Sequence, residues 1–555
     1  MKYNIIENYK FNHYYDVLTN KKYWDNNRFR VLNYEAGTGK TLKTYEFLGK
    51  MYKEGYSYRV LYVQPFSKEN RLLDSVRAIN EQAGSQIAAF VDANTTKSGY
   101  KYAMNAQVLC ITHNMYKEIC KGKHGNLMKD RDILIVDEFP NLFEQIVIDD
   151  NKLIDLLKFM KIDNKVKIIY DYIKQKQEEL GIYKSKMRIV KFNNKNIYKI
   201  LRHLHNIIHN RDNKKFIKQF KLLFESTVIY EKEKFYTFDN KIWYKLLKNN
   251  IILDANGGFD YRYRINKIFK IDYQSKAFDY KNSIINYYKI NTSKHALKSY
   301  DDFIQTVLNE VKENSKSKDK HLIVTDIENE SKFNEEYVKN WYKLDNIKVD
   351  HFGNLLGKND YRDFNKIWLF KTPNYAFVSY ILQYIFYSQK KIDNRYTLEI
   401  TNKGGYLHLK NNEFEKLRQS LLLGEYYQAI KRINRDNTRH TEINIFTNND
   451  KIIDKIKNQF KNIELTNKQI AVSFKKNYST KQSKTRIKIE EYKRLIIEAK
   501  KNNIAIIPKA DICDRLGFEK THLRRFLNKE EIIEFNNLYN IEVKHHVIIN
   551  KDIAI

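Results

Sequence analysis

A short loop of small residues that ends in lysine and threonine is the clearest chemical feature of the sequence. Its residues are Glu35, Ala36, Gly37, Thr38, Gly39, Lys40 and Thr41. Small residues let successive backbone N–H groups curl around a phosphate, and a helix expected over residues 42–50 adds its positive dipole. The lysine then reaches the β- and γ-phosphates, and the threonine hydroxyl binds Mg²⁺. Residues 36–41 therefore predict a nucleoside-triphosphate site, although Tyr34 stands where the full pattern has its first glycine.

Two carboxylates, Asp137 and Glu138, directly follow an apolar run at residues 133–136. A buried strand would present both acids at its carboxyl end, beside the loop. One carboxylate then holds Mg²⁺, and the other polarises the attacking water. Alone, such a strand end is common. Paired with the loop, it predicts hydrolysis of the nucleotide, with Asp137 on the metal and Glu138 as a catalytic residue.

A third group could neutralise the charge that builds on the γ-phosphate. Gln428, Arg432 and Arg435 stand at i, i+4 and i+7, on one face of an expected helix. Two guanidinium groups on that face stabilise the transition state, provided that the helix lines the cleft opposite the loop. The alternative is a solvated basic helix face, which the residues alone favour.

The segments that must position these groups alternate between strand-like and helical patterns. Strand-like runs with helical segments between them cover residues 30–34, 59–64, 107–112 and 132–137. This alternation is typical of a parallel α/β sheet. Further runs cover residues 251–255, 320–325, 347–352, 367–371 and 441–447. They predict a second α/β domain.

An inserted module separates the two α/β regions, because apolar residues recur there at helical spacing among many lysines and glycine nearly disappears. The division that follows is residues 1–150 as the first α/β domain, 151–249 as a helical basic insertion, 250–295 as an inter-domain segment, 296–450 as the second α/β domain, 451–486 as a basic linker and 487–555 as a C-terminal helical domain.

The order of these features resembles the superfamily 2 helicases and translocases of the DEAD/DEAH-like type. Residues 36–41 are similar to their motif I, Asp137-Glu138-Phe139-Pro140 to motif II, and residues 428–435 to motif VI with Lys431 in place of glycine. Shorter runs are similar to further motifs. Val63-Gln64-Pro65 and Ser67-Lys68 resemble motif Ia, and Ile111-Thr112-His113 resembles a strand end that touches nucleic acid. Residues 252–256 resemble motif III with Asn256 in place of threonine, and Gly353-Asn354 and Gly357-Lys358-Asn359 occupy the place of motifs IV and V. The likeness covers residues 29–450.

The resemblance implies an α/β protein with two RecA-like P-loop NTPase domains that clamp ATP and Mg²⁺ between them. The first domain would contribute Lys40, Thr41, Asp137 and Glu138, and the second would contribute Arg432 and Arg435. The residues implied to contact nucleic acid are Pro65, Lys68, Thr112 and His113. Opening and closing of the cleft would move the protein along a strand.

The insertion carries a basic stretch with interleaved rings. Residues 183–221 hold twelve Lys and Arg against a single acid, Asp212. Lysines that contact phosphates, together with rings that stack on bases, grip single strands. The alternative is a solvated helical module whose rings form its own core. The histidines at positions 203, 205 and 209 have no acid or thiol partner, so no metal site is predicted.

A helix, a glycine turn and a second helix are expected over residues 507–527, where apolar residues face inward at Ile512, Leu516 and Leu523. This pattern predicts a helix-turn-helix. The second helix would offer four residues to DNA: Lys520, Thr521, Arg524 and Arg525. The alternative is a helical hairpin that docks on protein.

The overall charge agrees with a polyanionic partner. The 555 residues include 100 Lys and Arg against 67 Asp and Glu, a formal net charge of +33. Codon drift in an AT-rich gene explains part of the lysine excess but does not select against acids. Nucleic acid is the expected partner and a membrane surface the weaker alternative.

The three cysteines form neither a disulfide framework nor an iron–sulfur site, and no apolar run has the length of a signal peptide or membrane span. We therefore expect a cytoplasmic protein, bacterial or within a virus-infected cell.

The function expected is an ATP-dependent DNA helicase or translocase, acting with replication proteins in DNA replication of a phage, plasmid or virus. The alternatives are an ATP-switched DNA-binding regulatory factor and an RNA helicase.

Overall fold

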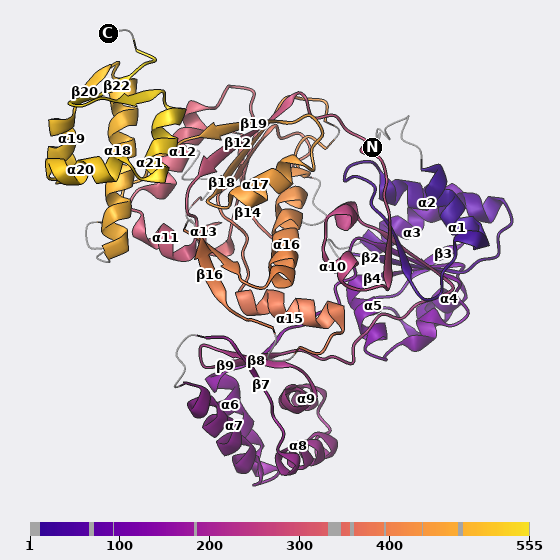
Figure 1. Cartoon of the computed structure of the whole chain (residues 1–555). Coiled ribbons are helices and arrows are strands. Elements are labelled where there is room, and N and C mark those ends of the chain that lie inside the picture. Colours follow the sequence, from indigo (N-terminus) through magenta and orange to yellow (C-terminus); the bar gives the residue numbers. More distant parts are fainter. Residues whose placement is uncertain are drawn as a thin grey trace.

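The chain folds around two parallel sheets, to which an inserted module and a C-terminal unit are attached (Figure 1). The computed structural model describes residues 11–65, 71–92, 94–181, 186–330, 333, 346–355, 360–392, 396–403, 405–435, 437–475 and 481–553. In Figure 1 the first sheet lies on the right, the second in the centre, the insertion below and the C-terminal unit at the upper left. No helix among these residues is long and apolar enough to cross a membrane.

The first sheet has seven parallel strands in the order β11-β1-β10-β5-β2-β4-β3. Their bounds are β1 Phe29–Leu32, β2 Val60–Gln64, β3 Ala88–Phe90, β4 Val108–Thr112, β5 Ile133–Asp137, β10 Asn249–Leu253 and β11 Phe269–Asp272. β2, β5 and β10 are buried along their whole length, because helices cover both faces. The structure confirms the four strands predicted in this region: β1, β2, β4 and β5 begin and end within two residues of the expected positions.

The side chains of this sheet alternate between two cores, one on each face. The helices on one face are α1 (Asn12–Thr19), α2 (Lys40–Lys53) and α3 (Arg71–Ala83). Those on the other are α4 (Lys97–Asn105) and α5 (His113–Cys120). The short helix α10 (Arg262–Ile265) connects β10 to β11.

The position of β10 corrects the predicted division of the chain. Residues 251–255 were expected in the second α/β domain and residues 250–295 in an inter-domain segment. Instead, β10 pairs with β1 on one side and with β5 on the other, in the middle of the first sheet. An apolar run predicts a buried strand but not the strands that pair with it. The sequence pattern therefore could not assign this strand to the first sheet.

The second sheet has six parallel strands in the order β14-β13-β15-β18-β12-β19. Their bounds are β12 Ser283–Lys289, β13 His321–Thr325, β14 Ile347–His351, β15 Lys366–Leu369, β18 Thr441–Thr447 and β19 Glu464–Lys468. The associated helices are α11 Lys294–Ser299, α12 Phe303–Glu313, α13 Ile327–Glu330, α16 Asn412–Ile430 and α17 Asp450–Lys457. β12 and β19 lie in segments expected to be an inter-domain segment and a basic linker, so the second domain is longer at both ends than predicted.

The insertion was expected to be mainly helical, and it contains an antiparallel sheet as well as helices. It contains α6 (Asp150–Leu157), α7 (Val166–Gly181), α8 (Lys195–Ile207) and α9 (Arg211–Glu225). It also contains an antiparallel sheet of β6 (Ile146–Ile148), β9 (Lys234–Thr237), β8 (Val228–Glu231) and β7 (Arg188–Val190). These strands have three or four residues each. Runs that short are hard to distinguish from helical patterns in sequence.

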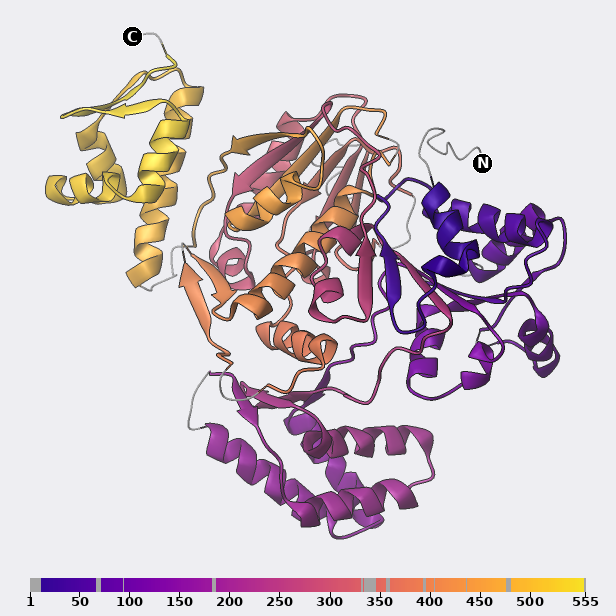
Figure 2. The same cartoon turned by 45° about the vertical axis from the view of Figure 1, so that its right-hand side comes forward.

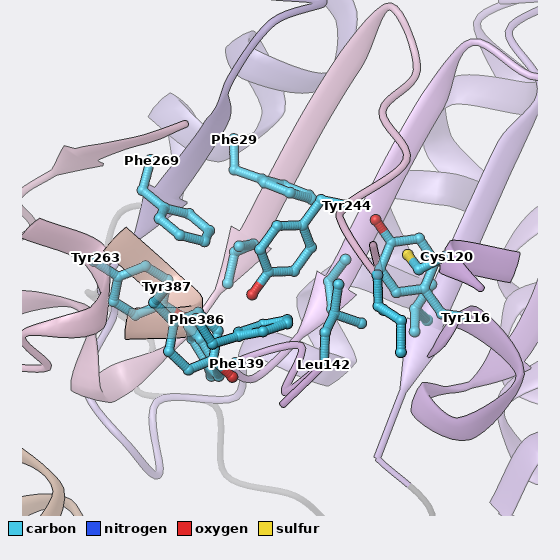
Figure 3. Packing of buried hydrophobic residues seen from close by; sticks show 14 of the residues in the cluster. Phe29, Tyr116, Cys120, Phe139, Leu142, Tyr244, Tyr263, Phe269, Phe386 and Tyr387 are labelled. Atoms are coloured by element: carbon cyan, nitrogen blue, oxygen red, sulfur yellow. The ribbon is translucent and has the colours of Figure 1, made fainter. Parts of the chain in front are cut away.

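A helix from the second domain completes the core of the first. α15 (Phe377–Ser388) leaves β15, and its Tyr387 ring lies edge-on to Phe139, 5.3 Å between centroids. The Tyr387 hydroxyl donates to Asn141 Oδ1 at 2.6 Å, and the Ser379 hydroxyl donates to Gln145 Oε1 at 2.6 Å. Figure 3 shows the α15 rings lying beside Phe139 in this core. The hairpin β16 (Ile400–Lys403) and β17 (Tyr406–Leu409) then leads into α16.

The C-terminal unit lies at the edge of the molecule, beside the second sheet domain (Figure 1 and Figure 2). Its elements are α18 Lys481–Lys501, β20 Ile506–Pro508, α19 Lys509–Leu516, α20 Lys520–Leu527, α21 Glu530–Leu538, β21 Ile541–Val543 and β22 Val547–Asn550. Its own apolar cluster includes the expected inward residues Ile512, Leu516 and Leu523. Surface ion pairs such as Lys289–Glu534, 3.4 Å, connect it to the second sheet domain.

Candidate nucleotide-binding site

The loop of small residues runs from the end of β1 into α2, as the sequence predicts. Gly37 and Gly39 both have φ +91°, a backbone conformation that favours glycine. The Lys40 ammonium donates to the backbone carbonyls of Tyr34, 3.1 Å, and Glu35, 3.3 Å. Burial lowers the pKa of Lys40, while the nearby carboxylates act in the opposite direction. The Lys40 ammonium is thus held beside the first residues of the loop.

The carboxylate at the end of β5 lies beside the start of α2. The Thr41 hydroxyl donates to Asp137 Oδ2 at 3.1 Å, and Arg71 reaches the same oxygen at 3.5 Å. The strand order explains this proximity, because β10 alone separates β1 from β5. Thr41 and Asp137 offer the hard oxygen ligands that Mg²⁺ takes, so these residues fit that metal.

Glu138 occupies an unusual backbone position next to Asp137. Its φ is +69°, and its N–H donates to the Leu253 carbonyl of β10 at 3.0 Å. Burial and the neighbouring Asp137 charge raise the pKa of Glu138 to about 7, while Arg432 acts in the opposite direction. A carboxylate of this basicity suits a general base at neutral pH.

The two arginines reach the cleft from a turn and not from a helix face. α16 ends at Ile430 with Lys431 as its C-cap, so Arg432 and Arg435 lie beyond the helix. The expected i, i+4, i+7 helical face is therefore wrong, because only Gln428 is helical. Both guanidinium groups nevertheless interact electrostatically with Glu138, and burial lowers the pKa of Arg432 to about 10.

Direct contacts connect the two domains across this cleft. Arg432 Nη2 donates to Gln428 Oε1 at 3.3 Å, and Gln428 Nε2 donates to Asn256 Oδ1 at 3.3 Å. Asn256 is the residue that stands where the helicase pattern has threonine, and here it receives the bond from the second domain. The Tyr427 hydroxyl accepts from the backbone N–H of Ala36 at 3.4 Å. The loop, the acids and the arginines thus meet where the two domains pack together.

Gly37 lies close to the backbone of the second domain. A Cβ at this position would lie 2.8 Å from the Arg435 carbonyl oxygen, whereas a Cβ at Gly39 meets no described atom within 4 Å. Left-handed backbone costs an L-residue roughly 1–2 kcal/mol, which both positions share. We therefore expect Gly37→Ala to lower the thermal unfolding midpoint, measured without nucleotide, more than Gly39→Ala does. Equal shifts would show that the domains do not meet at Gly37.

The residues expected to contact nucleic acid are more scattered. The Thr112 hydroxyl caps α5 by accepting from the Met115 N–H at 3.2 Å, and His113 Nε2 lies 2.8 Å from the Asp137 carbonyl oxygen. Burial lowers the pKa of His113 to about 4, so its imidazole is neutral. Pro65 follows β2 directly, and Lys68 and residues 357–359 lie outside the described residues. The nucleic-acid roles of this set stay predictions.

The C-terminal residues expected at DNA lie on α20. Arg524 and Arg525 are exposed, and α19 ends at Gly517 with φ +58° before α20 begins. The side chains of Lys520 and Thr521 lie outside what the structure describes. DNA contact by this helix stays a prediction.

Sequence reasoning assigned no role to several buried and half-buried groups at this domain contact. Arg71 on α3 contacts Asp137, and buried Asp254 follows β10 between the loop and the acids. Glu35 and Lys431 are also buried, as described below. The only sequence signal for Lys431 was its position at a usual glycine, and Arg71 carried none.

Together these features define an α/β protein with a P-loop on one parallel sheet and a second parallel sheet domain that faces this loop. No family model matches the chain, and no curated protein matches it.

Several solved structures are similar in part to the chain. Xpd4 of S. tokodaii is 14% identical with a TM-score of 0.49, over 79% of this chain and 96% of that one. S. cerevisiae Dbp5, bound to RNA and ADP BeF3, is 11% identical with a TM-score of 0.36, over 80% and 85%. The helicase Lhr of Mycobacterium smegmatis, bound to ssDNA and AMP-PNP, is 9% identical with a TM-score of 0.34, over 95% and 56%.

Proposed function

We propose that the chain hydrolyses ATP, with Mg²⁺, in the cleft between its two sheet domains, and that this hydrolysis moves it along nucleic acid or unwinds it. The observation that carries the proposal is the convergence of Lys40, Asp137 and Glu138 of the first domain with Arg432 and Arg435 of the second. Phosphoryl transfer to water needs these kinds of group in one place. Because two domains supply them, hydrolysis depends on how closely the domains approach.

Each residue of the cleft has a distinct role in this proposal. The backbone of residues 36–39 and the Lys40 ammonium hold the phosphates, and Thr41 and Asp137 would hold Mg²⁺, which supplies charge neutralisation when bound. Glu138 accepts a proton from the attacking water. Arg432 and Arg435 stabilise the charge of the transferring phosphoryl group, and Gln428 orients Arg432.

The charge of the insertion supports nucleic acid as the partner. Helices α8 and α9 of this module carry seven exposed basic residues: Lys195, Lys199, Arg202, Arg211, Lys214, Lys215 and Lys218. Phe192 and Phe220, in contrast, are buried in the module's own core. Contact through lysines and phosphates, without stacking on these two rings, is therefore the binding that the module favours.

We further propose DNA as the substrate in preference to RNA, with α20 as a duplex contact. Its exposed Arg524 and Arg525 suit phosphates or guanine edges. A motor with a separate duplex contact suits DNA replication in a phage, plasmid or virus, together with replication proteins.

A second function is an ATP-switched DNA-binding factor that does not separate strands. Two departures from the helicase pattern favour it, Asn256 in motif III and Lys431 in motif VI. Both residues make contacts between the domains, where hydrolysis would be coupled to movement.

ATP turnover by the full chain, alone and with single-stranded DNA, duplex DNA or RNA, tests the proposed function. We expect single-stranded DNA to stimulate turnover at least tenfold and its binding to weaken steeply with salt, about 10³-fold between 50 and 200 mM if some six phosphates are contacted. Stimulation without strand displacement would support the switched factor, and stronger stimulation by RNA would support an RNA helicase. Turnover that no nucleic acid changes would contradict the proposal.

A further inference from the structure

The buried Lys431 forms a hydrogen-bonded chain across the two domains. Its side chain is 4% exposed, and its ammonium donates to the Tyr280 hydroxyl at 2.7 Å. The same ammonium lies 4.2 Å from the centroid of the Phe278 ring, so a cation–π contact supports it. A lysine at a position where the helicase pattern has glycine is thus buried and held by a tyrosine and a phenylalanine ring.

Tyr280 passes the interaction on to the first domain. Its hydroxyl donates to Glu35 Oε1 at 2.5 Å, and Glu35 Oε2 accepts from the backbone N–H groups of Ala277, 2.9 Å, and Phe278, 3.3 Å. Glu35 is 2% exposed. A buried carboxylate and a buried ammonium are tolerated because each compensates the other through the tyrosine.

The relay consists of Lys431, Tyr280 and Glu35, which belong to three different segments of the site. Glu35 opens the phosphate loop, and its backbone carbonyl accepts from Lys40 at 3.3 Å and from the Thr38 hydroxyl at 2.8 Å. Tyr280 lies in the link between β11 of the first sheet and β12 of the second. Lys431 directly precedes Arg432. The relay therefore fixes the arginine turn relative to the loop.

The charges around Lys431 make its own protonation sensitive to pH. Burial lowers its pKa to about 7, and the attraction of Glu35 acts in the opposite direction. The other charged groups that act on it are Lys40 on α2, Lys276 in the link and Arg435 in the turn, whereas Tyr427 on α16 acts on Tyr280. The ammonium form predominates below this pKa, and it is lost as the pH rises above it.

We propose that Lys431 is a positioning residue for ATP hydrolysis, which through Tyr280 and Glu35 holds Arg432 and Arg435 against the phosphate loop. The inference rests on the proposed ATPase function. It makes the approach of the two domains depend on a buried lysine that reaches the phosphate loop only through Tyr280 and Glu35.

Three variants of the full chain test the proposal: Lys431→Met and Tyr280→Phe, which break the relay, and Lys281→Met, which removes an exposed lysine of the same link outside the relay. Turnover is measured with single-stranded DNA between pH 6 and 9. A small displacement of catalytic groups costs about ten- to hundredfold in rate. We expect such a fall in kcat for both relay variants with KM for ATP within about twofold, and little change for Lys281→Met.

The pH dependence separates positioning from a merely structural role. The ratio of wild-type to Lys431→Met kcat cancels every titration that the two proteins share. It should be largest near pH 6 and fall several-fold by pH 9, because the wild type then loses the charge that the variant lacks. A constant ratio, or kcat values within twofold of wild type, would overturn the proposal.

Two controls distinguish loss of the relay from misfolding of a variant and from failure of the proposed ATPase function. Tyr280→Phe removes a single oxygen, so its kcat tests the relay if Lys431→Met does not fold. A wild-type chain without ATP turnover would instead contradict the proposed function itself.

Discussion

Replacing Lys40 by alanine is expected to reduce ATP turnover by about 10²–10³-fold, the loss that follows removal of a preorganised electrostatic contact to a reacting group. The Lys40 ammonium lies at the mouth of the loop, bound to the Tyr34 and Glu35 carbonyls. A nucleotide phosphate would replace these neutral acceptors with a charged one. We expect both kcat and the affinity for ATP to fall, measured by steady-state turnover and by fluorescent-nucleotide titration.

Lys43→Ala is the matched control for this change. Lys43 lies on the same helix, but its ammonium pairs with Glu46 at 2.7 Å, away from Asp137. Its loss should leave turnover within about twofold, as is usual for a surface ion pair. Turnover that survives Lys40→Ala would remove the basis for an ATPase in this cleft.

Replacing Arg435 or Arg432 by alanine should be at least as damaging to kcat, because an arginine on the transferring phosphoryl group contributes about 10³–10⁵-fold. Both arginines come from the second domain, whereas the phosphate loop belongs to the first. ATP binding should therefore change much less than turnover. Single-turnover hydrolysis beside equilibrium nucleotide binding measures the two quantities separately.

Arg439→Ala serves as the control for the arginine variants. Arg439 follows the same turn, but it is exposed and pairs with Asp363 at 3.7 Å. We expect normal turnover for this variant. If Arg432→Ala and Arg435→Ala weakened binding and turnover equally, the arginines would belong to ground-state binding, and the cleft would not close for chemistry.

The local parts of the site were predictable because each is encoded in consecutive residues. The loop that begins at Ala36 needs small residues, a lysine and a helix start, and all three are adjacent in sequence. Asp137 and Glu138 likewise follow their own strand directly. For these groups a short pattern predicts both a chemistry and the element that presents it, and the element is present as predicted.

The long-range parts could not be predicted in the same way. β10 is an apolar run whose partners are β1 and β5, more than a hundred residues away, and no local pattern identifies them. The end of α16 was also missed, because Lys431 and Arg432 are compatible with helix and the turn is imposed by burial of Lys431 against Tyr280. Tertiary contacts decided both cases.

The packing of α15 has a consequence for how the chain is made. The Tyr387 hydroxyl and its partner Asn141 are 246 residues apart in sequence. At typical synthesis rates of 5–20 residues per second, roughly 12–50 s pass between the emergence of the two residues. During that interval the apolar face around Phe139 has no covering helix, so the first domain cannot finish folding as an independent unit at the ribosome. Its completion waits for the second.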